Sequence, residues 1–188
     1  MRKYILVFAI LFCSYSTHAQ TEASGLKQHK ALIAAMELAV TWFSDMVSSI
    51  STLVEQEKKS QFKSRLEELS YALDDVENEK SRLLMSLRKR NGTVSKAQLN
   101  YQKQLLSQAE ASSRDVSKLL TVKLQEQGQS VAIQLRKSLT QKGLYLDELR
   151  NYSSLTADEK QEIQAEGELL VKSMQAANLA LAKLIAKL

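Results

Sequence analysis

The sequence predicts an all-α protein: an elongated antiparallel bundle of four to five long amphipathic helices with coiled-coil-like packing, preceded by a cleaved signal peptide. The 188 residues contain no proline, so nothing of that kind interrupts long helices. Apolar residues recur at spacings of three and four, the pattern of helices that bury one face. Glycines and helix-capping residues fall between these periodic stretches. We therefore expect a signal peptide over residues 1–19 and one helical-bundle domain over residues 20–188.

The first nineteen residues have the features of an export signal. Arg2 and Lys3 precede a short apolar run over residues 4–12, and Thr17 and Ala19 place small residues at the positions that signal peptidase accepts. Cleavage is expected between Ala19 and Gln20. A membrane anchor is the alternative, but a spanning helix needs roughly 20 apolar residues, about twice this run.

The predicted export route also determines whether the protein can carry a lipid or form a disulfide through cysteine. Cys13 is the only cysteine, and the large Phe12 before it argues against lipid attachment there. The mature chain would then have no cysteine and form no disulfide, although its compartment permits them. We expect a periplasmic or secreted protein, with a Gram-negative envelope favoured by the short basic signal ending in Ala-Gln.

The first mature helix has an unusually wide apolar face. Its stripe is broadened by neighbouring apolar residues, so it is either the central helix of the bundle or a surface for self-association. Glu37 and Asp45 argue against a membrane span and are expected on the narrow wet side. The candidate interaction surface comprises Val40, Trp42, Phe43 and Val47.

A second apolar stripe runs from Phe62 to Leu87, with a polar interruption at Lys80. The polar residues 55–60 predict a turn between the first and the second stripe. The alternative is one long helix that carries both stripes and is locally rewound at these residues. The acidic run over residues 74–79 lacks the glycine of a calcium loop and lies on a continuous helical stripe. It is therefore interpreted as a solvated face.

The later breaks follow from glycines and caps. Gly92 and Ser95 predict the end of one helix and the start of the next, and Gln98 completes a capping box. The third helix is expected to end near Gly128, although a helix tolerates one glycine at a cost of about 1 kcal/mol. A segment from Val131 is expected to kink or divide at Gly143.

The last helix has the strongest start signal, a capping box from Thr156 to Glu159. Gly167 and Ala177 lie on its apolar stripe, which predicts that another helix or a large side chain approaches closely. The order in which the helices pack stays open.

Charge is distributed without a strong bias. Loss of Arg2 and Lys3 would reduce the formal net charge of +5 by two, and only 6% of residues are aromatic, which argues against nucleic-acid binding. One basic group lies at the end of a predicted helical hairpin and either complements a helix dipole or contacts an anion. Its members are Arg88, Lys89, Arg90 and Lys96.

Residues for common catalytic and metal sites are absent from the predicted mature chain. It has no cysteine and one histidine, His29, which leaves no base-activated nucleophile, zinc ligand set or Glu-x-x-His pair. We expect no enzyme activity, cofactor or metal. Asn91 and Asn151 head glycosylation sequons, which could carry glycans if the source is eukaryotic.

These features favour a non-enzymatic exported protein that acts as an interaction or scaffold component of the envelope, for example as a secretion-system accessory. The alternatives are a periplasmic chaperone-like holdase and a secreted helical toxin or effector that acts on membranes. The expected partners are proteins of unknown identity, including further copies of the chain. No nucleic-acid partner is expected, and no transmembrane segment after signal cleavage.

Overall fold

The computed structural model describes residues 30–49, 59–88, 95–140 and 155–188. Within these residues the chain forms five helices and no strand, which confirms the all-α prediction. The predicted signal peptide lies outside the described residues. The helices are Lys30–Ser49, α2 (Lys59–Arg88), α3 (Lys96–Ser117), α4 (Val122–Thr140) and α6 (Ala157–Ile185).

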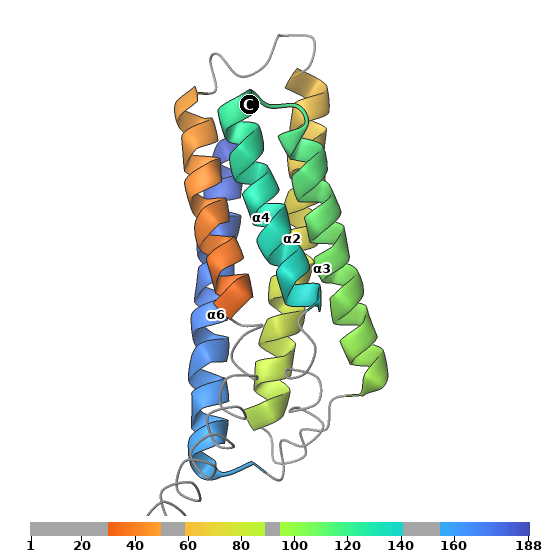
Figure 1. Ribbon diagram of the computed structural model, residues 1–188, viewed down its shortest axis with the longest axis vertical. Helices are drawn as coiled ribbons and strands as arrows, with labels where there is room; N and C mark the ends of the chain where they lie inside the picture. The colour runs from red at the N-terminus through yellow and green to blue at the C-terminus, as the bar shows by residue number, and fades with distance from the viewer. Residues whose placement is uncertain (1–29, 50–58, 89–94, 141–154) are drawn as a thin grey trace, which may run out of the picture.

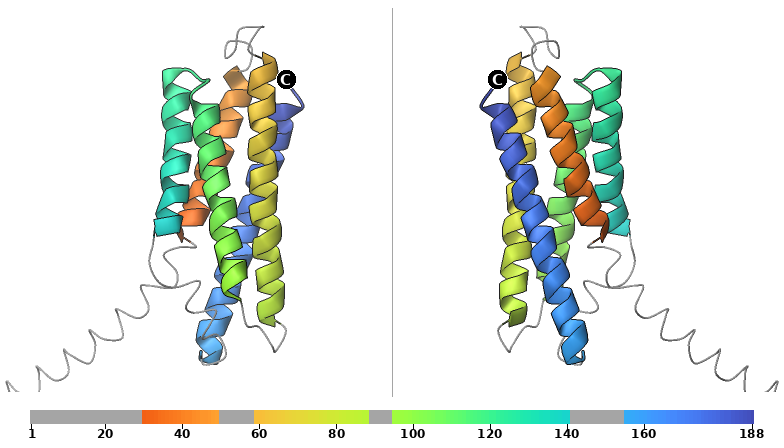
Figure 2. Two further views of the ribbon diagram at one scale, coloured as in Figure 1. Left: turned by 90° about the vertical axis from the view of Figure 1, so that its right-hand side faces the viewer. Right: turned by 90° about the vertical axis from the view of Figure 1, so that its left-hand side faces the viewer.

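The five helices stand side by side around a common apolar core (Figure 1). Helix α2 packs against α3 and α6, and α3 packs against α4. The Lys30–Ser49 helix closes the ring, because its Asp45 accepts a 2.8 Å hydrogen bond from Gln127 of α4 and its Val40 shares a groove with Ser173 of α6. Figure 2 shows the same neighbours from both sides.

Chain direction alternates around this ring at every contact except one. The Lys30–Ser49 helix, α3 and α6 run upward in Figure 1, whereas α2 and α4 run downward. A ring with an odd number of helices cannot alternate throughout, so the Lys30–Ser49 helix and α6 lie side by side in parallel. The expected antiparallel arrangement therefore holds everywhere but at this seam.

The wide apolar face of the Lys30–Ser49 helix is buried inside the bundle. By length and composition alone this helix could cross a membrane, a test that the core helix of a bundle also passes. Its largest apolar side chains are buried in the core. Trp42 and Phe43 stack with ring centroids 5.3 Å apart. The helix forms one wall of the ring. The buried residues are Leu32, Ala35, Met36, Ala39, Trp42, Phe43 and Met46.

Local capping signals predicted two helix starts correctly. Ser95 and Gln98 form a reciprocal capping box at α3, and Thr156 and Glu159 form one at α6. The close approach expected at Gly167 is also confirmed, because the Leu84 side chain of α2 packs directly against it.

The predicted helix end at Gly128 is wrong. Helix α3 already ends at Ser117, and α4 begins at Val122 and continues through Gly128. The break has neither glycine nor proline. It coincides with the point where the apolar spacing becomes four and four, at Val116, Leu120 and Leu124. The glycine serves a close approach between helices instead, because Trp42 lies over it.

This contact leads to a prediction for Gly128→Ala. An alanine Cβ would lie 2.5 Å from Trp42 Cζ2 and 2.8 Å from Ser117 Cβ, and the indole is fully buried among the core side chains. We expect the substitution to lower the free energy of unfolding by about 1–3 kcal/mol, although alanine is the better helix former by about 1 kcal/mol.

Urea denaturation of the wild type and the variant measures this loss. The control is Gln129→Ala, which alters the exposed neighbour in the same helix and should change stability by less than about 0.5 kcal/mol. A Gly128→Ala protein more stable than the wild type would contradict the packing of Trp42 on α4.

Candidate functional site

Buried polar side chains fall into two groups. Ser113, Ser117 and Ser138 each donate to a backbone carbonyl in their own helix, so their polarity is satisfied locally. Glu79, Lys80 and Gln102 instead bring polar groups of α2 and α3 together, and we name them the Lys80 cluster. This cluster is the place among the described residues where a buried amine faces another helix.

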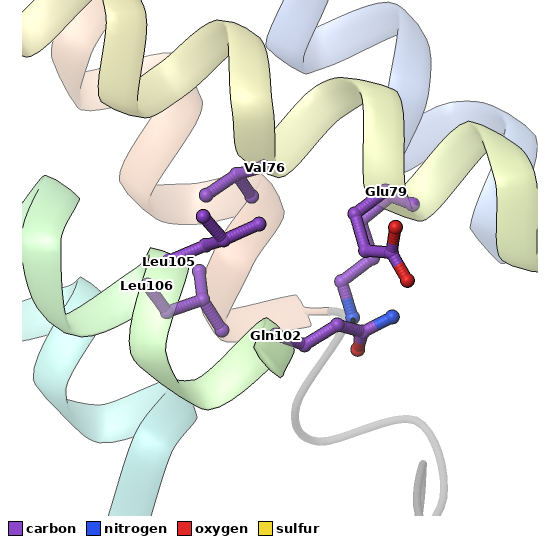
Figure 3. A pocket seen from close by; sticks show the side chains of 6 residues that line it. Val76, Glu79, Gln102, Leu105 and Leu106 are labelled. Atoms are coloured by element: carbon purple, nitrogen blue, oxygen red, sulfur yellow. Dashed lines mark hydrogen bonds between the residues drawn. The ribbon is translucent and has the colours of Figure 1, made fainter. Parts of the chain in front are cut away.

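The Lys80 cluster is closed on one side by apolar side chains. Figure 3 shows Val76, Leu105 and Leu106 on one side, with Glu79 and Gln102 on the other. Lys80 is 2% exposed, and its Nζ donates to Gln102 Oε1 at 3.3 Å. The space among these side chains is too small to admit a water molecule. The cluster therefore has no room for a ligand.

Burial dominates the electrostatics of the cluster. It lowers the pKa of Lys80 to about 7, and the Glu79 carboxylate acts in the opposite direction. Glu79 also lies 3.8 Å from the exposed guanidinium of Arg82. The Gln102 amide nitrogen is buried and has no hydrogen-bond partner among the described groups. A neutral lysine amine is a nucleophile, but without access for a substrate this one has a structural role.

The acidic run that precedes Lys80 is only partly solvated, contrary to expectation. Asp74 and Asp75 are exposed. Glu77 accepts a 2.7 Å hydrogen bond from Asn178 of α6, and Glu79 is buried. The run is long enough to turn from the outer face of α2 toward both neighbouring helices. Among the described residues no group of three or more His, Cys, Asp or Glu could hold a metal.

The residues expected to form an interaction surface divide into two kinds. Trp42 and Phe43 are 0% and 1% exposed, so neither reaches a partner while the bundle is closed. Val40 and Val47 are half-buried at the edge of the core. Val40 lies at the parallel seam between the Lys30–Ser49 helix and α6, and Val47, seven residues later, lies on the same side of its helix.

An open groove follows this seam. It has a volume of about 220 Å³ and is lined by Glu37, Val40, Ser173 and Ala176. The short side chains on α6 leave the hollow, and Val40 provides its apolar wall. We call it the seam groove. Unlike the Lys80 cluster, it is accessible from outside.

The predicted basic group is described only in part. Arg88 is the last residue of α2 and Lys96 the first of α3, so the chain places both helix ends at the same end of the bundle (Figure 1). Lys96 is exposed. Lys89, Arg90, Asn91, Asn151 and His29 lie outside the described residues.

Within the described parts of the chain, the geometry thus offers a closed polar cluster and an open groove. Comparisons of this chain with protein-family models, with curated proteins and with solved structures found no significant match.

Proposed function

We propose that this protein is exported and acts, without catalysis, as an interaction or scaffold component of the cell envelope. The observation that supports this proposal is the seam groove, an open hollow of about 220 Å³ between two helices. Grooves between helices accept apolar side chains of a partner helix. The alternating three and four spacing along each helix further suggests coiled-coil-like packing within the bundle.

The exposed apolar side chains beside the groove support the same function. Leu169 of α6 is 50% exposed, and its place one helical turn before Ser173 puts it at the groove. On the facing helix, Val40 is half-buried. An apolar hollow with an adjoining leucine provides surface that a protein partner can bury at about 25 cal/mol per Å².

A photo-crosslinking side chain at Leu169 tests this function in the producing cell. The proposal expects crosslinks to one partner, seen as a single species of defined mass or, where the partner is a further copy, as regular multiples of the chain's own mass. The matched control carries the same crosslinker at the exposed Gln104 of α3 and should give none. A smear of many unfolded clients at both positions would support a holdase instead, and release of dye from vesicles by the purified protein would support a membrane-acting toxin.

Export has a separate test. We expect the purified protein to begin at Gln20, because Thr17 and Ala19 provide the small residues that precede a signal-peptidase cut. Intact-mass measurement decides this. A mass that retains Met1, or one that includes a lipid on Cys13, would contradict the proposed route.

A further inference from the structure

The seam groove is part of two longer stripes that run along the parallel helices. Each stripe steps alternately by four and three residues, which keeps its members on one side of the helix. The seam therefore presents continuous surface over several turns. The stripe on the first helix comprises Ile33, Glu37, Val40, Ser44 and Val47, and the stripe on α6 comprises Glu166, Leu169, Ser173, Ala176, Ala180 and Lys183.

Topology indicates which direction a docked helix would take. Every other pair of neighbours around the ring is antiparallel, and the Lys30–Ser49 helix and α6 are the parallel exception (Figures 1 and 2). A helix placed in the seam and running downward in Figure 1 would be antiparallel to both. It would restore the alternation that the odd number of helices interrupts.

Charge along the seam points to the same direction. Both seam helices run upward in Figure 1. Glu37 and Glu166 precede Val40 and Ser173 along their helices, and Lys183 follows Ser173. The two glutamates therefore lie nearer the start of the seam and Lys183 nearer its end. A downward helix has its N-terminus at the top, where its own acidic residues are favoured by the helix dipole and would face Lys183. Basic residues near its C-terminus would face the two glutamates.

Helix α2 carries on its outer surface a stripe with acidic residues toward its N-terminus and a basic residue toward its C-terminus. Two large apolar side chains stand out, Tyr71 at 72% and Met85 at 54% exposed. Acidic residues precede them or lie between them, and Arg82 lies in the C-terminal half. All members of the stripe are exposed, and they are Glu68, Tyr71, Asp75, Asn78, Arg82 and Met85.

The spacing of the two surfaces also matches. Tyr71 and Met85 are separated by as many residues as Ile33 and Val47, a distance of roughly 21 Å along a helix. With the α2 stripe antiparallel to the seam, Tyr71 would lie against Val47 and Met85 against Ile33. Arg82 would then be level with Glu37.

We propose that the protein assembles with further copies of itself head to tail, the outer stripe of α2 on one copy docking in the seam groove of the next. This inference rests on the proposed interaction function and names its partner. Because the two surfaces differ, the contact is heterologous and generates closed rings or open filaments. Each copy then uses one groove and offers one helix.

The test uses the exported protein with its native N-terminus and measures mass by analytical ultracentrifugation. The wild type should form species larger than a monomer. Ala176→Arg, which fills the groove, and Tyr71→Glu, which charges the α2 stripe, should each be folded monomers. An equal mixture of these two variants should form a dimer, because each variant keeps the surface that the other lacks.

Matched controls and a second groove variant keep the outcome decisive. Ile133→Glu places the same charge on another exposed apolar residue, on α4, and should assemble as the wild type does. If Ala176→Arg fails to fold, Ser173→Arg replaces it. A monomeric wild type, or a mixture that stays monomeric, would overturn self-assembly. A crosslink from Leu169 to a different protein would still leave the proposed interaction function standing.

A charge exchange tests the register. Glu37→Lys and Arg82→Glu should each weaken association by about tenfold, equivalent to about 1.4 kcal/mol, because each places like charges opposite one another. The double variant restores an opposite pair between copies and should recover most of the loss. If the double variant instead lost as much affinity as the sum of the two single variants, this register would be excluded.

Discussion

Phe43→Asp should abolish the folded state, whereas Val40→Asp, only three residues away, should leave the protein helical. Phe43 is 1% exposed and stacks on Trp42 at 5.3 Å. Its loss would forfeit about 3–5 kcal/mol of packing, and an unpaired buried carboxylate adds a cost of several kcal/mol. Together these approach or exceed the total stability of about 5–15 kcal/mol expected for a domain.

Val40 differs because it lies at an open groove. The side chain is half-buried and lines the seam with Glu37 and Ser173, so an aspartate there can extend its carboxylate into water. We expect a loss below about 2 kcal/mol, typical of a single substitution outside the closed core. Far-UV circular dichroism and thermal melts of the two variants measure the difference.

The opposite result would change the picture of the first helix. If Phe43→Asp remained folded and only the mass of its assembly in solution decreased, the aromatic pair would lie in an interface between copies and not in the core of one chain. If Val40→Asp also unfolded the protein, the seam would be closed in solution and the groove could not accept a partner.

Features encoded by neighbouring residues could be predicted from the sequence. The capping boxes at Ser95 and Thr156 need only residues three positions apart, and the apolar stripes need only one or two turns of helix. These local signals gave the all-α class and the start of two helices. They also indicated that a large side chain would approach Gly167.

Features that depend on another helix could not be predicted in this way. Gly128 suggested a helix end because a glycine without known surroundings is most simply a terminator, and only the position of Trp42 shows that it permits close packing. The break after Ser117 lacks the usual residues and shows itself only as a slip in the apolar spacing. Ring closure, and with it the parallel seam, also depends on which helices become neighbours.

The candidate surface was predicted in part for the same reason. Sequence periodicity placed Val40, Trp42, Phe43 and Val47 on one broad face. It could not separate the aromatic pair, which points into the ring, from the valines, which lie at its edge. The signal that could have done so is the second stripe on α6, whose small residues Ser173 and Ala176 match the valines only once both helices are known to be adjacent.

Lys80 provides the second large effect, a stability that rises with pH. Its pKa is about 7 in the folded protein against an ordinary value of 10.5. Between these values the unfolded chain binds more protons than the folded chain, so the free energy of unfolding should increase with pH above about 7, by up to about 1.4 kcal/mol per pH unit. Below about pH 7 both states hold the proton, and the cost of the buried charge is fully present.

Replacing the amine should remove this slope. Urea denaturation from about pH 6 to pH 9 should show a flatter profile for Lys80→Met than for the wild type, while Lys63→Met, at an exposed position on the same helix, should keep the wild-type slope. An unchanged slope in Lys80→Met would show that the Lys80 amine is solvated and that the contact between α2 and α3 is more open than the 3.3 Å bond to Gln102 implies.

The absolute stability of Lys80→Met depends on Gln102, the hydrogen-bond partner that remains when the lysine is replaced. Lys80→Met alone leaves Gln102 Oε1 buried without the donor it has in the wild type, at a cost of about 1–3 kcal/mol, which offsets the relief from burying a charge. Lys80→Met combined with Gln102→Leu removes both groups. Because it leaves no orphaned amide oxygen, the double variant should be more stable than Lys80→Met at about pH 6, by up to about 1–3 kcal/mol, which is the cost of a buried oxygen without a donor. A double variant less stable than Lys80→Met alone would show that Gln102 contributes to the contact between α2 and α3 independently of the lysine.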